Sequence, residues 1–140
     1  MKNVTEESFG IIPLKHSGED WSVFVILHKH GNHWGFPKGK PEHDREHPRE
    51  SAARELKEET GLNVEKFLRE EPISEAYTFY RPGEKVEKTV HYFPAVVSGA
   101  LLLQPEEIRD GKWVSFEEAI AQLTFEEAKR ICTQIQQSLA

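Results

Sequence analysis

Nine residues in the middle of the chain, Arg54 to Leu62, constrain its fold and chemistry more than any other stretch. They read Arg-Glu-Leu-Lys-Glu-Glu-Thr-Gly-Leu. On a helix that advances about 100° per residue, Glu55, Glu58 and Glu59 fall within an arc of roughly 100°. Like charges this close repel one another and weaken an isolated helix. The cluster is either an ordinary solvated acidic face or a set of oxygen ligands for a hard cation such as Mg²⁺.

The flanking residues predict a helix from Pro48 to Thr60. Proline suits the first helical position, because its missing N–H would be unpaired there. Gly61 suits the position just past the last turn, where a left-handed backbone is common. A narrow stripe lies beside the carboxylates and consists of Ala52, Ala53, Leu56 and Thr60. We therefore expect this helix to pack closely on a sheet while its acidic residues face a cleft.

A loop with glycines around a Pro-Lys pair precedes the helix and reads Gly35-Phe36-Pro37-Lys38-Gly39-Lys40. Such a loop is tight and exposes backbone groups, and Lys38 and Lys40 could pair with phosphate as point charges. Arg54 can reach a carboxylate four residues away on the helix. Taken alone, the two lysines could equally be solvated turn residues and Arg54 an exposed ion pair of little consequence.

Taken together, these residues resemble the signature of the Nudix hydrolases. That signature runs Gly, five residues, Glu, seven residues, then Arg-Glu-aliphatic-any-Glu-Glu-any-Gly-aliphatic. Residues 54–62 match its second half throughout, and seven residues separate Glu46 from Arg54. One departure is that six residues, not five, separate Gly39 from Glu46. We place the extra residue in the loop of residues 42–45.

The resemblance implies an α/β protein of the Nudix type, an α/β/α sandwich with a mixed β-sheet and a catalytic loop-helix. It also implies a hydrolase that cleaves a phosphoanhydride bond with Mg²⁺, for which Mn²⁺ could substitute. The implied metal ligands are Glu55, Glu58, Glu59 and the carbonyl of Gly39, with Arg54 orienting the first glutamate and Glu46 in a supporting role. Bound cations would neutralise phosphate charge and lower the pKa of a water, and a carboxylate could take its proton.

A further carboxylate, Glu107, lies six residues before Trp113. That spacing resembles a glutamate that often serves Nudix enzymes as an additional ligand or base. Glu107 could equally belong to a solvated turn. The catalytic set that we expect is therefore Arg54, Glu58, Glu59 and Glu107.

A narrower resemblance links the chain to the diadenosine tetraphosphate hydrolases of this family. It rests on His33-Trp34, on Lys88-Thr89-Val90-His91-Tyr92-Phe93, and on Trp113 followed by Phe116-Glu117-Glu118-Ala119. It implies asymmetric attack of water on a dinucleoside tetraphosphate, of the bis(5′-nucleosyl)-tetraphosphatase (asymmetrical) type, giving ATP and AMP. The implied substrate contacts are Lys38 and Lys88 for phosphate and Tyr80 and Tyr92 for adenine. Lys40, from the glycine-flanked loop, is a further candidate for contact with phosphate.

The aromatic residues of this region also permit a simpler interpretation. Strand alternation puts Lys88, Val90 and Tyr92 on one face, which suits stacking of a base and contact with a phosphate. Stacking of a base on an aromatic ring contributes roughly 1–3 kcal/mol. The alternative is that the aromatic residues are sheet core, and for Phe79 and Phe93 we expect core. Tyr77 and Tyr80 bracket a tyrosine position of the same resemblance.

Two other functions remain open. One is a nucleoside triphosphate pyrophosphohydrolase or an RNA 5′-pyrophosphohydrolase, although the net charge of −6 counts against RNA. The other is a catalytically silent Nudix domain that binds a nucleotide and regulates another process. A silent domain should have lost helix carboxylates, and all three are present.

The whole chain has 140 residues, which predicts a single domain spanning residues 1–140. Its acidic balance argues against long nucleic acid as a partner, whereas bound cations would still permit a small dinucleoside polyphosphate. Cys132 is the only cysteine and residues 1–8 are mostly polar, which favours the cytoplasm. No apolar run approaches membrane-spanning length, and nothing demands a dimer, so we expect a monomer.

The remaining elements follow from local patterns. We expect strands at residues 8–14, 21–28, 66–68, 73–80, 88–97 and 112–115, with a hairpin turn within residues 81–87. Capping-box patterns at Ser115 and Thr124 predict two helices. The second should run to Leu139 and dock on the sheet through a stripe made of Phe125, Ala128, Ile131, Cys132, Ile135 and Leu139.

Overall fold

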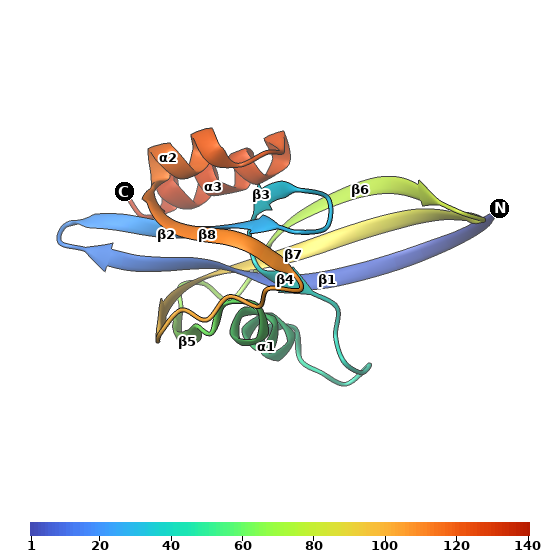
Figure 1. Cartoon of the computed structure of the whole chain (residues 1–140), viewed down its shortest axis with the longest axis horizontal. Coiled ribbons are helices and arrows are strands. Elements are labelled where there is room, and N and C mark those ends of the chain that lie inside the picture. The colour runs from blue at the N-terminus through green and yellow to red at the C-terminus, as the bar shows by residue number, and fades with distance from the viewer.

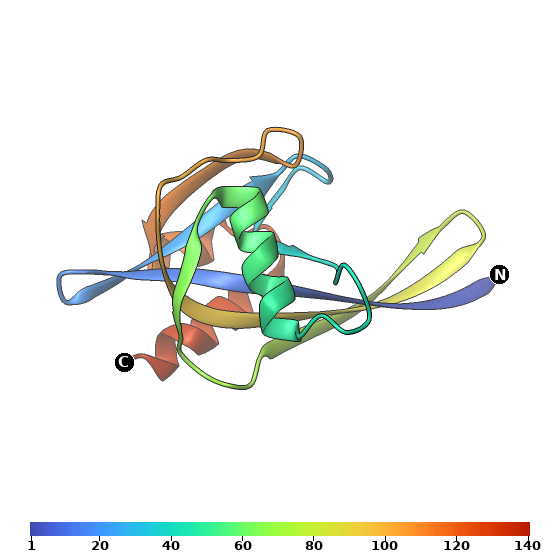
Figure 2. The ribbon, with the colours of Figure 1, turned by 90° about the horizontal axis from the view of Figure 1, so that it is seen from below.

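In the computed structural model, which describes all 140 residues, one mixed sheet lies between helix α1 and the helix pair α2–α3 (Figures 1 and 2). The helices are α1 (Pro48–Thr60), α2 (Phe116–Gln122) and α3 (Glu126–Ser138). The strands are β1 (Lys2–Ser17), β2 (Asp20–His28), β3 (His33–Gly35), β4 (Lys38–Gly39), β5 (Asn63–Phe67), β6 (Ile73–Arg81), β7 (Glu84–Ser98) and β8 (Ile108–Ser115). The predicted α/β/α sandwich with a mixed sheet is confirmed.

The parallel pairing of β1 with β7 is the centre of the sheet. It runs without a break from Lys2 opposite Glu84 to Leu14 opposite Val96. The strand order is β3-β2-β1-β7-β5, and β4, β6 and β8 pair antiparallel with β1, β7 and β2. Because side chains alternate along a strand, Ile11 and Ile12 are both fully buried on opposite faces. Ile11 packs in the core beneath α1, and Ile12 in the core beneath α2 and α3.

The outer ends of β1, β6 and β7 project beyond the helices as a three-stranded extension (Figures 1 and 2). We call this extension the wing and define it as residues 2–8, 73–81 and 84–91. Its face on the α2–α3 side carries side chains in rows across the strands. One row is Val4, Val86 and Phe79, and the next is Glu6, Lys88 and Tyr77. This face of the wing is continuous with the face of the sheet that α3 covers.

The prediction for α1 is confirmed at both ends, whereas the strands are longer than expected. β1 begins at Lys2, not Ser8, and β8 begins at Ile108, not Lys112. Both added segments are mostly polar and exposed, so their sequences lack the apolar alternation that predicts a strand. They are strands because they pair with a neighbouring strand. The hairpin turn is correspondingly tight, at Pro82-Gly83, with Gly83 at φ 76°.

One predicted helix start is wrong. The Ser115 capping box is present, but α3 begins after Phe125 and has no side-chain cap. The Thr124 hydroxyl instead accepts a hydrogen bond of 2.9 Å from the Trp34 backbone N–H. Phe125 also departs from the predicted buried stripe, because it is 55% exposed. None of the helices is both long and apolar enough to cross a bilayer.

Candidate active site

Helix α1 is fixed at both ends and along one side, so its acidic residues have defined positions. The His47 side chain accepts a hydrogen bond from the Arg49 N–H at the start of the helix. Gly61 closes it with φ 82° and donates its N–H to the carbonyl of Lys57. Ala52 and Leu56 are fully buried against the sheet. Glu55 and Glu59, one turn apart, therefore lie together beside the sheet.

Glu59 is the most unusual of these carboxylates. Its side chain is buried, and its Oε2 atom is shielded from solvent without a hydrogen-bond partner. Burial is the largest cause that raises the pKa of Glu59. The neighbouring Glu55 carboxyl and the charge of Glu107 raise this pKa further. Burial also raises the pKa of Glu55. A buried oxygen without a partner is costly in a folded protein, and a bound cation would provide a partner for it.

Strand β4 brings the backbone of Gly39 against Glu55. A β-carbon at position 39 would overlap the Glu55 carboxylate, so only glycine leaves room for this approach. The loop that reads Phe36-Pro37-Lys38-Gly39 therefore lies directly beside the acidic helix, although the two are separate in sequence. The extra residue between Gly39 and Glu46 does not prevent this contact.

Arg54 connects the helix to the preceding loop. Its guanidinium donates to both oxygens of Glu46 at 2.9 and 3.1 Å and to Glu55 at 3.0 Å. It also donates to Glu58 at 3.1 Å and to the carbonyl of Lys40 at 2.9 Å. Hydrogen bonds from Arg54 lower the pKa of Glu46 to about 2.

The residues fit a divalent cation, although not as a finished cage. No three Asp, Glu, His or Cys side chains converge around one point. Glu55 lies against Gly39 and next to Glu59, whereas Glu58 is about half exposed and pairs with Arg54. The shielded Glu59 oxygen and the close approach of Gly39 to Glu55 both suit a cation held by carboxylate and carbonyl oxygens.

A cavity of about 620 Å³ lies beside this cluster, between β3, β6 and the start of α3. Its walls are largely aromatic, and they include His33, Trp34, Tyr77, Tyr92 and Phe125. The centre of the His33 imidazole ring lies 5.1 Å from the centre of the Phe125 ring. A cavity of this size with aromatic walls suits a planar organic group such as a nucleobase.

Lys38 joins the cavity to the acidic cluster. It lines the cavity, and its charge interacts with Glu59, Glu75 and Glu55. Burial lowers the pKa of its ammonium group. An anionic group lying between the carboxylate cluster and the aromatic cavity would therefore contact Lys38.

The profile of the NUDIX domain matches residues 5–134 of the chain. The chain belongs to the Nudix family. A search of curated protein sequences gave no match. Nudix hydrolases act on pyrophosphate bonds of small nucleotide substrates and generally use divalent metals such as Mg²⁺, which agrees with the acidic cluster beside a base-sized cavity.

Solved Nudix structures share the fold at low sequence identity. An Ap4A hydrolase from C. elegans, in a binary complex, has a TM-score of 0.74 and 19% identity, covering 96% of this chain and 97% of that one. The NUDIX domain of Shewanella oneidensis NrtR, complexed with ADP ribose, has a TM-score of 0.78 and 15% identity, covering 98% and 90%. The E. coli dihydroneopterin triphosphate pyrophosphohydrolase has a TM-score of 0.69 and 17% identity, covering 94% and 96%.

Within the Nudix signature, the structure brings together most of the residues that the sequence singled out. Glu55, Glu59 and Gly39 meet at one place, and Arg54 with Glu46 supports them. Glu107 lies in the loop before β8, close enough for its charge to raise the pKa of Glu59 after the larger effect of burial. Glu58 differs from the other two, because it is about half exposed and shares the Nη1 donor of Arg54 with Glu55.

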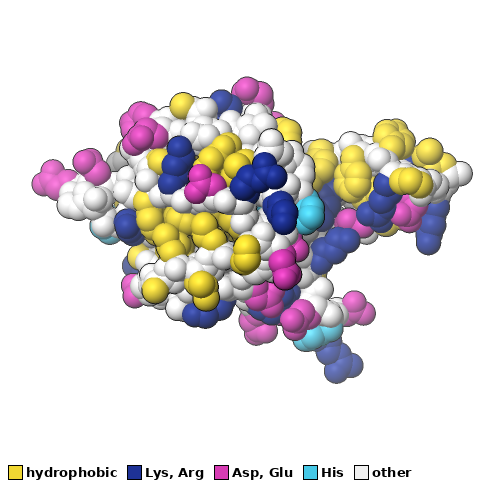
Figure 3. All heavy atoms as spheres, viewed as in Figure 1, with side chains coloured by type: hydrophobic (Ala, Val, Ile, Leu, Met, Phe, Trp, Pro, Cys, Tyr) yellow, Lys and Arg dark blue, Asp and Glu magenta, His cyan; other side chains and the backbone are white.

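The lysines expected to contact phosphate have different surroundings. Lys38 faces the cluster, whereas Lys40 and Lys88 both pair with Glu6, at 3.1 and 3.7 Å. Arg81 joins the same carboxylate at 2.8 Å. Three cations thus surround one partly buried anion on the wing, where Figure 3 shows basic and apolar side chains side by side. Arg81 also pairs with Glu84 at 2.6 Å, so the three cations and two carboxylates together keep one positive charge in excess.

The predicted tyrosine pair needs correction. Tyr92 belongs to the cavity but is only 4% exposed, with its ring 5.7 Å from Phe36. Tyr80 is exposed, and strand alternation places it on the opposite face of β6 from the cavity. The two tyrosines therefore cannot hold the same base. Tyr77, which lies on the cavity side and is 44% exposed, takes the place expected for Tyr80.

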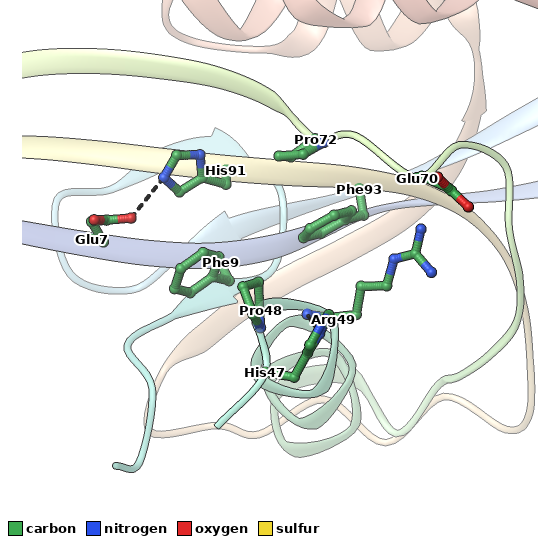
Figure 4. Close-up of a pocket in the computed structure, with 9 residues that line it drawn as sticks. All are labelled: Glu7, Phe9, His47, Pro48, Arg49, Glu70, Pro72, His91 and Phe93. Atoms are coloured by element: carbon green, nitrogen blue, oxygen red, sulfur yellow. Dashed lines mark hydrogen bonds and ion pairs between the residues drawn. The ribbon is translucent and has the colours of Figure 1, made fainter. Parts of the chain in front are cut away.

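A second, smaller cavity of about 330 Å³ lies on the α1 side of the sheet (Figure 4). His91 borders it, and both of its ring nitrogens have partners, Glu7 at 2.8 Å and Ser74 at 2.6 Å. The Arg49 guanidinium covers the Phe93 ring nearby. The cavity is lined from the N-terminal end of α1 and contains none of the signature carboxylates.

Glu75 and Phe125 are two of the main-cavity residues that were missed from the sequence. Glu75 lies in a predicted strand but was not predicted as a site residue. Strand alternation puts it on the same face as Ile73 and Tyr77, which could have placed it on the cavity side. Phe125 was assigned to the buried stripe of α3 but lies at the cavity edge because the helix begins one residue later. No local pattern marks that shift.

Proposed function

We propose that this protein is a Mg²⁺-dependent Nudix hydrolase that splits dinucleoside tetraphosphates asymmetrically, converting diadenosine tetraphosphate to ATP and AMP. The observation that carries this proposal is the shielded, partnerless oxygen of Glu59 beside Glu55 and Gly39, next to a base-sized aromatic cavity. Lys38 connects these two parts.

In the proposed reaction, Glu55, Glu59 and the Gly39 carbonyl would hold the cation, with Mn²⁺ as a substitute for Mg²⁺. A bound divalent cation supplies charge neutralisation at the phosphates and a lower pKa for the attacking water. Glu58 would join as a ligand once its pair with Arg54 opens, and Arg54 would still orient Glu55 through the Glu46 contact. Glu107, exposed in the loop before β8, would accept the proton of the water.

The preference for a tetraphosphate over a shorter chain rests on charge beyond the acidic cluster. Lys88, Lys40 and Arg81 extend the basic path of Lys38 along the wing, with Glu6 as their only shared anion. A chain of four phosphates could reach this group, and a monomeric enzyme would suffice. Burial lowers the pKa of Lys88, and nearby Glu6 opposes that effect.

A nucleoside triphosphate pyrophosphohydrolase is the second candidate. One aromatic cavity lies beside the cluster and provides space for one base. A substrate with one base, such as a nucleoside triphosphate, would therefore fit it. The two candidates differ in the substrate that is cleaved most efficiently.

Product analysis separates them. The protein should convert diadenosine tetraphosphate with Mg²⁺ into equal amounts of ATP and AMP, and for a given base its kcat/KM should be higher for the dinucleoside tetraphosphate than for the nucleoside triphosphate. Glu58→Gln should remove this turnover while the fold remains intact. Formation of two ADP molecules, or faster cleavage of the triphosphate that carries the same base, would overturn the tetraphosphate proposal.

A further inference from the structure

Glu75 is a carboxylate without a partner inside the aromatic cavity. It shares a face of β6 with Ile73 and Tyr77, lines the cavity and is partly buried. It forms no hydrogen bond and no ion pair with any protein group. Burial raises its pKa, and the charge of Lys38 opposes that effect. A partly desolvated carboxylate is unfavourable unless something binds to it.

The other acidic residues of the cavity differ from Glu75. Glu126 and Glu127 stand at its edge and are exposed, and Glu127 pairs with Arg130 at 2.9 Å. Glu75 is therefore the carboxylate best placed to meet the edge of a planar group that enters between Tyr77 and Phe125. An ionised carboxylate only accepts hydrogen bonds, so it selects a group that presents donors.

Among nucleobases, a guanine edge complements a carboxylate best. Guanine presents a ring N–H and an adjacent amino group, so two parallel donors can meet two carboxylate oxygens. Adenine presents one amino donor next to a ring nitrogen whose lone pair would face the carboxylate. Stacking on aromatic rings tolerates any base, so the discrimination would come from this pairing.

We propose that Glu75 reads the base of the substrate and makes the cavity select a guanine-type base over adenine. The inference rests on the proposed function, because it specifies which dinucleoside tetraphosphate the same site prefers. Bidentate pairing of a side chain with a base edge gives discrimination of about tenfold or more.

Three tetraphosphates test this inference: diguanosine, diinosine and diadenosine tetraphosphate. Inosine keeps the ring N–H of guanine but lacks the amino group, so kcat/KM should fall in the order guanosine, inosine, adenosine. Glu75→Gln offers one donor and one acceptor, which complements adenine. In this variant the guanosine-to-adenosine ratio of kcat/KM should fall at least about tenfold.

Glu87→Gln is the matched control, because Glu87 is exposed on the opposite face of the wing and its change alters the net charge equally. It should leave the ratio unchanged. Glu75→Gln should also unfold at the same temperature or higher, since it removes a partly buried charge without a partner. A ratio that is the same in wild type and Glu75→Gln, or a wild type that prefers adenosine, would overturn the inference.

Binding measurements separate this inference from the proposed function. If the wild type cleaves none of the tetraphosphates, the proposed function fails, and titration with GMP and AMP then decides the role of Glu75. GMP should bind the wild type about tenfold more tightly than AMP, and this difference should vanish in Glu75→Gln. Equal affinity of the wild type for both nucleotides would contradict the inference.

Discussion

At the scale of single residues, Arg54 organises the acidic cluster. Its planar guanidinium donates simultaneously to Glu46, Glu55, Glu58 and the carbonyl of Lys40. A lysine could not reproduce this arrangement, because its ammonium lacks the rigid fork of donors. Glu46 pairs directly with Arg54, which agrees with the supporting role that the signature implies for Glu46.

Glu46→Gln should destabilise the protein by about 1–3 kcal/mol at neutral pH, because it weakens charged hydrogen bonds that the Arg54 guanidinium still needs. Arg54 lowers the pKa of Glu46 from 4.5 to about 2. The stabilisation is therefore complete above pH 4.5 and is lost as the pH falls towards 2. Urea unfolding at several pH values measures the difference between the two proteins, which should shrink on acidification.

Glu42→Gln is the control for this measurement, since Glu42 is 59% exposed and lies 3.7 Å from Arg54. It should change the free energy of unfolding by less than about 0.5 kcal/mol. Equal stability of Glu46→Gln and the wild type at neutral pH would show that the Arg54–Glu46 contact does not support the site.

At the scale of elements, the contact between β4 and α1 decides whether the cluster can form. Gly39→Ala would place a methyl group where the Glu55 carboxylate lies. That carboxylate is the end of a flexible side chain, so it should turn away at little cost to folding. We expect a similar melting temperature, loss of the Mg²⁺-induced rise in that temperature, and at least a hundredfold lower turnover, roughly the effect of losing one electrostatic contact at a reaction centre. A normal response to Mg²⁺ would contradict the role of this contact.

Strand alternation on β6 leads to a second prediction at this scale. Tyr77→Ala should raise KM for diadenosine tetraphosphate about tenfold with little change in kcat, because base stacking contributes uniform binding. Tyr80→Ala is the matched comparison, since Tyr80 lies on the opposite face of the same strand. Steady-state kinetics should show the effect for Tyr77 alone, and the reverse pattern would restore the original expectation for Tyr80.

The elements also show how far a sequence can be interpreted. Helix α1 could be predicted to the residue, because Pro48 and Gly61 act locally and the acidic residues lie on consecutive turns. The aromatic cavity could not, because Lys38, Glu75 and Phe125 are far apart in the chain and meet only through the β6–β7 pairing and the packing of α3. The start of α3 depends on the tertiary contact of Thr124 with Trp34.

At the scale of the whole molecule, an acidic chain presents its cations where an anionic substrate would lie. The net charge is −6, yet Lys38, Lys40, Lys88 and Arg81 form a path that leads from the cluster onto the wing. The charge total argues against long nucleic acid as a partner but could not locate this basic path. The long parallel pairing of β1 with β7 brings Glu6 and Lys88 together, and no local pattern predicts it.

Titration calorimetry with Mg²⁺, in buffers of different ionisation enthalpy, tests the central claim most directly. Burial raises the pKa of Glu59, so this group holds a proton further into the neutral range than an ordinary carboxyl, and a cation must displace it. The account predicts proton release on Mg²⁺ binding, an affinity that rises with pH, and at least roughly tenfold weaker binding without proton release in Glu59→Gln. Binding of equal strength in Glu59→Gln, or binding without proton release in the wild type, would contradict it.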